Sequence, residues 1–351
     1  MNRFLAKRWF RDRLSFLIDL SALKKIAFLL LITFLVLVIS TGLGDMKIAP
    51  WTVIEVFFGG GSSLEQLVVT SFRLPRILIA LLAGIALAVA GGILQGMIRN
   101  PLASPDIIGI TGGAGTAVVG FLALFSNADN VLTVSIQWLP VAAFIGATII
   151  AFLVYFLAWR NGVSPVRLVL IGIGVSALTQ AATTLLMIFG PIYRASQANI
   201  WLTGTVNGSD WSDVIILLPW TIIFVLLTFL LSRHLNIQEL GEEIATSVGV
   251  PVQRQRFLLL FMSTALVGGA VAFAGGIGFV GLMAPHMARR IVGSSYGALL
   301  PTAALIGGTL VMVADLIGRT LFLPLEVPAG VFTASIGAPY FIYLLFKTRN
   351  A

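Results

Sequence analysis

Two ionisable side chains stand out because they lie at the end of a long apolar run of this 351-residue chain. Asp315 and Arg319 are four residues apart, so on a helix they lie on the same side and can form an ion pair. An acid inside a membrane helix is costly, and ion-coupled carriers use such acids near the midplane. From the residues alone, a structural ion pair and a role in transport are equally open for Asp315.

No metal or nucleotide motif accompanies them. The two histidines, His234 and His286, are far apart, neither has a second His at ligand spacing, and the chain contains no cysteine. We therefore expect no site for a bare metal ion, and a metal that this protein moves should arrive inside a chelate. The run 276–281 matches G-x-G-x-x-G, but it lies between two apolar segments and not after a strand. No G-x-x-x-x-G-K-[ST] motif occurs, so this chain cannot by itself bind ATP in a P-loop. A membrane enzyme would need convergent acid, base or metal-ligating residues at one depth, and the sequence shows none, so we predict no catalytic residue and no cofactor bound directly.

The composition indicates that a bilayer positions these residues. Hydrophobic residues make up 58% of the chain and the mean hydropathy is +1.02, far above a soluble domain. Charge-free windows of about 20 residues, the length of a membrane helix, recur along the chain. They cover residues 26–44, 77–98, 107–128, 130–159, 168–193, 214–232, 257–288, 291–314 and 327–346. Window 257–288 is too long for one span and contains Gly275 and Gly276, which weaken a helix, so it predicts two spans. The predicted fold is an all-α polytopic membrane protein with about ten helices.

The distribution of positive charge predicts the orientation. With ten spans, 17 of the 22 Lys and Arg residues fall on the cytoplasmic side, against 14 with nine spans, so ten fit the positive-inside rule better. Both termini are then cytoplasmic. We expect residues 1–25 to form a basic cytoplasmic tail along anionic lipid, 26–346 the transmembrane domain, and 347–351 a second tail. The net charge of +8 is dispersed over separate loops, which argues against nucleic-acid binding.

The most polar stretch inside the chain is residues 235–256, LNIQELGEEIATSVGVPVQRQR. It predicts a short helix, because Glu242 and Glu243 suit a first turn, Gly249 suits a left-handed C-terminus, and Pro251 prevents continuation. Such a helix is too small to be stable alone. It either folds onto its own bundle or fits a groove of a soluble partner.

Residues 241–256 resemble the coupling-helix segment of the FecCD-type (type II) ABC import permeases, which take up iron siderophores, haem and vitamin B12. Further segments resemble the signatures of that family in its usual order and cover most of the chain beyond the N-terminal tail. They are residues 71–115, 201–211, 278–293, 314–319 and 324–345.

The resemblance implies a non-catalytic permease in the cytoplasmic membrane of a prokaryote, with ten helices per subunit. It implies a second permease subunit, identical or homologous, two ATPase subunits that use ATP, and an extracytoplasmic substrate-binding protein. Ferric siderophore is the expected cargo, with haem or vitamin B12 as alternatives. An ion-coupled secondary transporter is the alternative outside the family, and Asp315 would be its only candidate ion site.

The resemblance also assigns roles to residues. The ATPase-docking element comprises Gly241, Glu242, Glu243, Ala245, Gly249 and Pro251. Carboxylates of the binding protein are expected to meet Arg73, Arg76 and Arg319, although lipid headgroups or an internal partner such as Glu326 could occupy these arginines instead.

The expected constriction is the connection between spans four and five, and span five is expected to line the pathway. The corresponding residues are Asn161, Gly162, Val163 and Ser164 in the connection, and Ser176, Thr179, Gln180, Thr183 and Thr184 in the span. The hydroxyls and amide of the span could equally bond to neighbouring helices.

Overall fold

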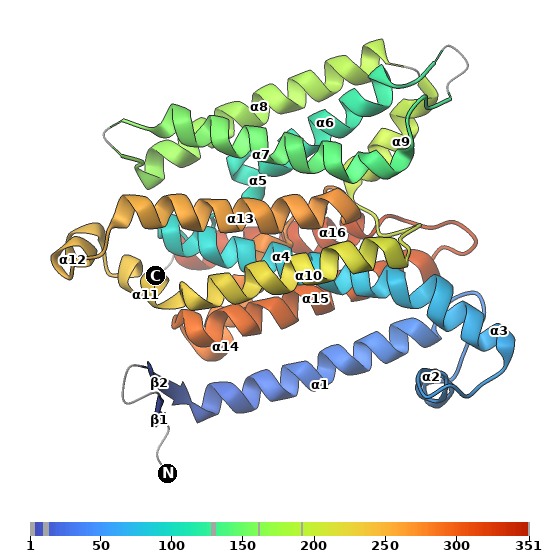
Figure 1. Ribbon diagram of the computed structural model, residues 1–351, viewed down its shortest axis with the longest axis horizontal. Helices are drawn as coiled ribbons and strands as arrows, with labels where there is room; N and C mark the ends of the chain where they lie inside the picture. Colours follow the sequence, from blue (N-terminus) through green and yellow to red (C-terminus); the bar gives the residue numbers. More distant parts are fainter. Residues whose placement is uncertain (1–3, 10–13, 128–130, 161, 191, 350–351) are drawn as a thin grey trace.

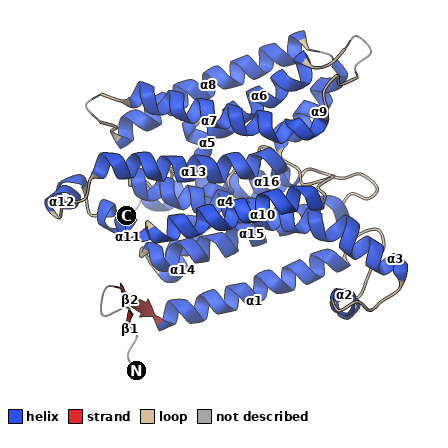
Figure 2. Ribbon diagram, viewed as in Figure 1, coloured by secondary structure: helices blue, strands red, loops and turns tan. Residues whose placement is uncertain are grey.

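The computed structural model describes residues 4–9, 14–127, 131–160, 162–190 and 192–349. They form a helical bundle preceded by one short hairpin, as the colouring of Figure 2 shows. The prediction of an all-α membrane fold is confirmed, and the hairpin is a small addition to it. The strands β1 (Phe4–Trp9) and β2 (Leu14–Asp19) pair antiparallel, and the Asp19 side chain then caps the first helix by accepting the backbone N–H of Ser21 at 2.8 Å.

Each predicted apolar segment coincides with a helix. These helices are α1 (Leu20–Gly42), α4 (Leu74–Ile98), α6 (Ile110–Leu124), α7 (Leu139–Ala158), α8 (Pro165–Phe189), α10 (Trp211–Leu230), α13 (Val252–Ala274), α14 (Val280–Val292), α15 (Tyr296–Thr320) and α16 (Ala329–Arg349). Shorter elements connect them: α2 (Pro50–Phe57), α3 (Ser63–Gln66), the π-helical η1 (Leu67–Arg73), α5 (Pro105–Ile108), the 3-10 turn η2 (Ile136–Trp138), α9 (Ile192–Thr203), α11 (Ser232–Glu239) and α12 (Glu242–Ser247).

Length and composition separate the helices into two groups. Within the described residues, seven helical segments are long and apolar enough to cross a membrane, namely those containing α1, α4, α7, α8, α10, α13 and α15. Helices α6 and α16 are shorter apolar helices. With 13 residues, α14 is about 20 Å long, shorter than the roughly 30 Å of a bilayer core.

The predicted break at Gly275 and Gly276 is confirmed, because α13 ends at Ala274 and α14 begins at Val280. Gly275 has a φ of 67°, and the Gly276 N–H donates to the Trp201 carbonyl at the end of α9 over 3.1 Å. The G-x-G-x-x-G run is therefore a break between two helices. Helix α13 precedes it, where a dinucleotide site requires a strand.

Helix α4 forms the centre of the bundle. Nearly all of its side chains are buried, and it packs against α10, α13, α14 and α15. Helix α1 packs on α15, and the layer of α6, α7 and α8 joins the centre largely through α13 and α5 (Figure 1). The chain therefore divides into a central group around α4 and a side layer.

Glycines allow this close packing. A Cβ on Gly84 would overlap the backbone of Gly307 on α15, and a Cβ on Gly113 would overlap the Gly146 carbonyl oxygen on α7. Small residues at these positions let the helix backbones approach closely, as is typical of helix packing in lipid.

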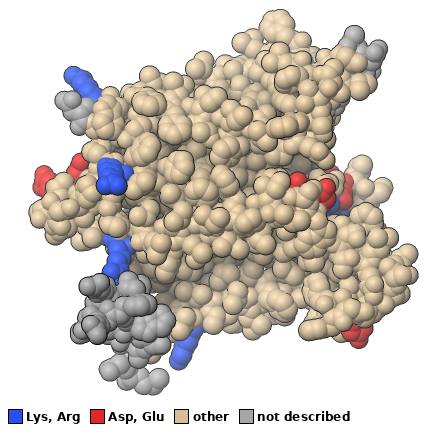
Figure 3. Space-filling model, in the orientation of Figure 1, with Lys and Arg blue, Asp and Glu red and all other residues tan. Residues whose placement is uncertain are grey.

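The two ends of the bundle differ in chemistry. One end, the α12 end, holds α11, α12, the start of α1, the end of α16 and the turn between α7 and α8; the other, the α2 end, holds α2 and α3 (Figure 1). Most Lys and Arg side chains visible in Figure 3 lie at the α12 end. This is the pattern that the positive-inside rule describes.

Candidate functional site

Helix α12 has well-defined ends, as the sequence predicts. It begins after Gly241, with Glu242 and Glu243 in its first turn. At its C-terminus, the Gly249 N–H donates to the Thr246 carbonyl and the next N–H donates to the Ala245 carbonyl, while Gly249 has a φ of 81°. This pair of bonds is a Schellman motif, which requires a left-handed residue at the position of Gly249. Pro251 follows two residues after Gly249 and serves as N-cap of α13.

One side of α12 packs against the bundle and the other side is exposed. Ala245 is fully buried against the bundle, whereas Ile244 is 49% and Val248 62% exposed. Leu240, just before the helix, is 65% exposed. The helix therefore presents an apolar surface, made of Leu240, Ile244 and Val248, at the tip of the α12 end. We refer to these three residues as the α12 tip.

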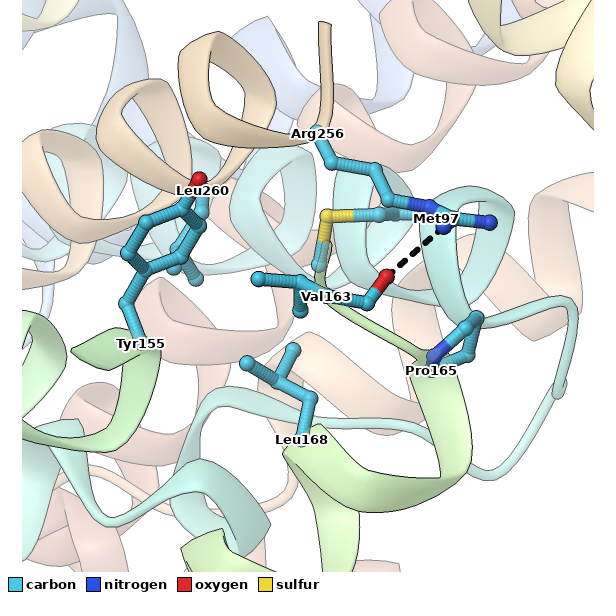
Figure 4. Close-up of a pocket in the computed structure, with 7 residues that line it drawn as sticks. All are labelled: Met97, Tyr155, Val163, Pro165, Leu168, Arg256 and Leu260. Carbon is cyan, nitrogen blue, oxygen red and sulfur yellow. Dashed lines mark hydrogen bonds between the residues drawn. The ribbon is translucent and has the colours of Figure 1, made fainter. Parts of the chain in front are cut away.

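The loop after α7 lies against the first turns of α13. The Val163 N–H donates to Gln253 Oε1 at 2.8 Å, and the Val163 carbonyl accepts from Arg256 Nη1 at 2.7 Å. Figure 4 shows Arg256 reaching across from α13 to this carbonyl. Gly162 has a φ of 113°, and Ser164 occupies the N-cap position of α8. The fourth predicted constriction residue, Asn161, lies outside the described residues.

The same two side chains contact α12. Arg256 Nη2 lies 2.8 Å from Glu242 Oε2, and Gln253 Nε2 lies 3.4 Å from Glu242 Oε1. The predicted docking helix and the predicted constriction are therefore joined through the first turns of α13. Sequence reasoning missed Gln253 and treated Arg256 only as a topology signal.

The predicted pathway residues of α8 divide between two faces. Thr179 and Thr183 are buried, and the Thr116 hydroxyl of α6 lies 3.0 Å from the Thr179 carbonyl and 2.9 Å from Thr183 Oγ1. The Ser176 hydroxyl donates to the Asp106 carbonyl of α5 at 3.3 Å. Of the predicted pathway residues in α8, Gln180 and Thr184, one turn apart, lie on the exposed face of the helix.

The three predicted docking arginines meet at the α2 end, and two of them share one acid. Arg76 Nη2 lies 2.8 Å and Arg319 Nε 3.3 Å from the Asp315 carboxylate, whose side chain is 3% exposed. Arg76 Nη1 also lies 3.0 Å from Glu326, which is 37% exposed. Of the two interpretations left open for Asp315, this geometry favours the structural ion pair, because two guanidinium groups already neutralise the acid.

The same arginines hold the end of α1. Arg73 donates to the carbonyls of Thr41 and Gly42 at 3.0 Å each and to Met46 at 2.6 Å, and Arg319 donates to the carbonyls of residues 40 and 43. The last carbonyls of a helix have no partner within the helix, so these bonds satisfy groups that would otherwise be unpaired. The sequence offered no signal for them.

All three arginines line one cleft of about 460 Å³ at the α2 end, together with Asn207, Asp210 and Glu326 among others. The Ser212 side chain donates a hydrogen bond to Asp210, and this bond lowers the pKa of the Asp210 carboxyl below its usual value. The cleft therefore contains both charges at neutral pH. Among the described residues, no group of three His, Asp or Glu side chains could hold a metal ion.

Comparison with known proteins places this geometry in context. Residues 30–347 match the model of the FecCD transport family. YfhA of Bacillus subtilis, whose name assigns it to siderophore transport as a permease, is 62% identical over 93% of this chain and 96% of its own length. CbrC of Dickeya dadantii, an achromobactin transport system permease protein, is 46% identical over 97% of both chains. A solved metal-chelate-type ABC transporter in an inward-facing conformation superimposes with a TM-score of 0.82 at 31% identity, covering 92% of this chain and 99% of that one.

Replacing Asp315 by Asn tests the arginine cluster. The substitution removes the buried carboxylate that Arg76 and Arg319 share, which leaves Arg319 without an acidic partner and Arg76 with only the partly exposed Glu326, so we expect the unfolding free energy to fall by about 3–5 kcal/mol. The matched control, Glu326→Gln, removes a partly exposed partner and should cost less than about 1 kcal/mol. Thermal unfolding of the detergent-solubilised protein measures both, and equal shifts for the two variants would contradict the assignment.

Proposed function

Because this chain belongs to the FecCD transport family, we propose that it is the permease subunit of an ABC importer that moves ferric siderophore across the cytoplasmic membrane. The 62% identity to a relative named for siderophore transport carries the choice of cargo. Iron enters this proposal as a siderophore chelate, the class of cargo that the name of this relative gives.

The α12 end is proposed to face the cytoplasm. The concentration of Lys and Arg at this end supports the proposed orientation (Figure 3). In this orientation both terminal tails, residues 1–25 and 347–351, would be cytoplasmic. The hairpin of β1 and β2 would then lie beside the cytoplasmic leaflet, where anionic lipid attracts basic segments.

The α12 tip is proposed to dock a separate ATPase subunit. An exposed apolar cluster on a helix that is capped at its C-terminus and anchored through Ala245 is suited to insert into a groove and to transmit a push as a rigid body. The surrounding residues of the docking element are Gly241, Glu242, Glu243, Gly249 and Pro251. Because this chain has no P-loop motif, ATP hydrolysis belongs to that partner, of which two copies are expected.

The cleft at the α2 end is proposed to receive the substrate-binding protein. Arg73, Arg76 and Arg319 line it, and the partly exposed Glu326 is the internal acid that an incoming carboxylate could displace. Such exposed pairs would orient docking and accelerate it more than they would tighten it.

The exposed face of α8 is proposed to meet a second permease subunit, identical or homologous, around a shared pathway. Gln180 and Thr184 lie on this face, and the loop of residues 162–164 lies at its α12 end, where it would form the constriction. Thr179, Thr183 and Ser176 would support this wall from behind through their bonds to α5 and α6.

Reconstitution tests the transport proposal. Proteoliposomes that contain the permease pair, the ATPase and the binding protein should take up ⁵⁵Fe-siderophore only when ATP is enclosed, and an ATPase variant defective in hydrolysis is the control. Uptake of haem or vitamin B12 in preference would reassign the cargo. Uphill uptake driven by an ion gradient without the ATPase would reject the proposal in favour of a secondary transporter.

Replacing Val248 by Asp tests ATPase docking. A charge in the centre of the α12 tip should weaken ATPase association at least about tenfold, because desolvating it in an apolar groove is costly. Val131→Asp is the matched control, since Val131 is 57% exposed and lies in the connection between α6 and η2. Titration of labelled ATPase against the permease in nanodiscs measures the effect, and equal affinities for the two variants would exclude the α12 tip from the interface.

Replacing Glu326 by Gln tests docking of the binding protein. Freed from this acid, Arg76 should attract carboxylates more strongly, and affinity should rise about two- to fivefold at low salt and less at high salt. Glu55→Gln makes the same charge change in α2 at the same end. Surface plasmon resonance at two ionic strengths measures both, and a change no larger than that of the control would remove the cleft from the interface.

A further inference from the structure

We propose that Gln253 and Arg256 are positioning residues that tie the loop of residues 162–164 to α12, so that this loop moves whenever α12 is displaced. The contacts form a closed chain from the carboxylate of Glu242, through Gln253 and Arg256, to the backbone of Val163. We call this set of four residues the α12 tie. The proposal rests on the function proposed above, in which α12 receives the motion of the ATPase.

Two parallel sets of hydrogen bonds in the α12 tie fix the orientation of the loop relative to α12. Glu242 Oε2 bonds to Arg256 Nη2 at 2.8 Å, and Arg256 Nη1 bonds to the Val163 carbonyl at 2.7 Å. Glu242 Oε1 lies 3.4 Å from Gln253 Nε2, and Gln253 Oε1 accepts the Val163 N–H at 2.8 Å. Both backbone groups of one loop residue are therefore connected to both oxygens of one carboxylate. A single contact would allow rotation, whereas this pair fixes the distance and the orientation of the loop.

Burial makes the Arg256 route costly to break. The Arg256 side chain is 6% exposed and lines a small apolar pocket together with Met97, Tyr155, Leu168 and Leu260 among others (Figure 4). Its Nε has no hydrogen-bond partner. Separation from Glu242 or from Val163 would leave a buried cation with still fewer partners, which a protein interior tolerates poorly. Movement of α12 together with Arg256 and the loop therefore costs less free energy than movement that separates α12 from them.

Steric contact reinforces the bonds. A Cβ on Gly162 would lie 2.8 Å from the Gln253 side-chain amide, and the φ of 113° at Gly162 is accessible mainly to glycine. The loop thus lies against Gln253 with no space for another side chain. Neither Gln253 nor Arg256 needs to touch the cargo for this role.

The test separates hydrolysis from transport in the complete reconstituted complex. Gln253→Ala removes the amide route, and Arg256→Lys keeps the charge beside Glu242 but loses the planar fork that also reaches the Val163 carbonyl. Both variants should retain ATPase association and ATP hydrolysis. Because coupling between linked sites typically corresponds to about 5- to 150-fold, transport per ATP hydrolysed should fall at least about fivefold.

A neighbouring pair supplies the matched control. Gln255, between the two tie residues in sequence, is buried and accepts a bond from Gln238 at 3.4 Å. Gln255→Ala should leave transport per ATP unchanged. The proposal is overturned if Gln255→Ala uncouples transport as strongly as Gln253→Ala, or if Gln253→Ala and Arg256→Lys retain wild-type coupling.

A measurement on the permease alone distinguishes failure of the α12 tie from failure of the proposed function. Loss of the Gln253 acceptor should accelerate hydrogen exchange in the peptide containing Val163 on the order of tenfold, with the Gln255→Ala variant unchanged. Unaltered exchange in Gln253→Ala would overturn the α12 tie whatever the complex transports. If the wild-type complex shows no ATP-driven uptake, the proposed function is rejected. The exchange result would then still test the α12 tie.

Discussion

The close approach of helix backbones around α4 is the constraint on which the rest of the structure depends. In a bilayer, apolar side chains gain little by leaving lipid, so helices associate through packing and hydrogen bonds. Gly84 against Gly307 and Gly91 against Gly281 bring α4 into backbone contact with α15 and α14. These contacts leave no space for a Cβ, so the central group is a closely packed body that can carry polar clusters at both of its ends.

Both clusters contain the same arrangement, in which an arginine bonds to backbone carbonyls and a carboxylate balances its charge. At the α2 end, Arg319 bonds to the end of α1 and pairs with Asp315. At the α12 end, Arg256 bonds to Val163 and pairs with Glu242. A planar guanidinium can make both contacts at once, which a lysine cannot. The difference lies in what is held: a helix end in one case and a loop in the other.

The sequence predicted what depends on neighbouring residues. Apolar windows located the helices, Gly275 located the break, and Gly249 with Pro251 defined the end of α12, since each signal acts within one or two turns. Partners far apart in sequence were not predictable. Arg254 and Arg256 look alike in the sequence, yet Arg254 is exposed and Arg256 is buried, because only the second faces the loop after α7. The docking, constriction and pathway roles stay predictions.

Taken together, the contacts indicate where the molecule can change shape. At the α2 end, Arg73, Arg76 and Arg319 connect α1, α4 and α15. A force applied at this end therefore acts on these helices together. At the α12 end, the α12 tie joins α12, α13 and the loop before α8. Separate bonds at the same end connect α11 to α14 through Glu239 and Arg289, and α11 to α15 through Asn236 and Tyr296. Helix α13 also carries most of the contact between the side layer and the centre. A displacement that enters at α12 therefore reaches α13 and the loop before α8 directly through the α12 tie, and α13 is the helix through which the side layer mainly contacts the centre.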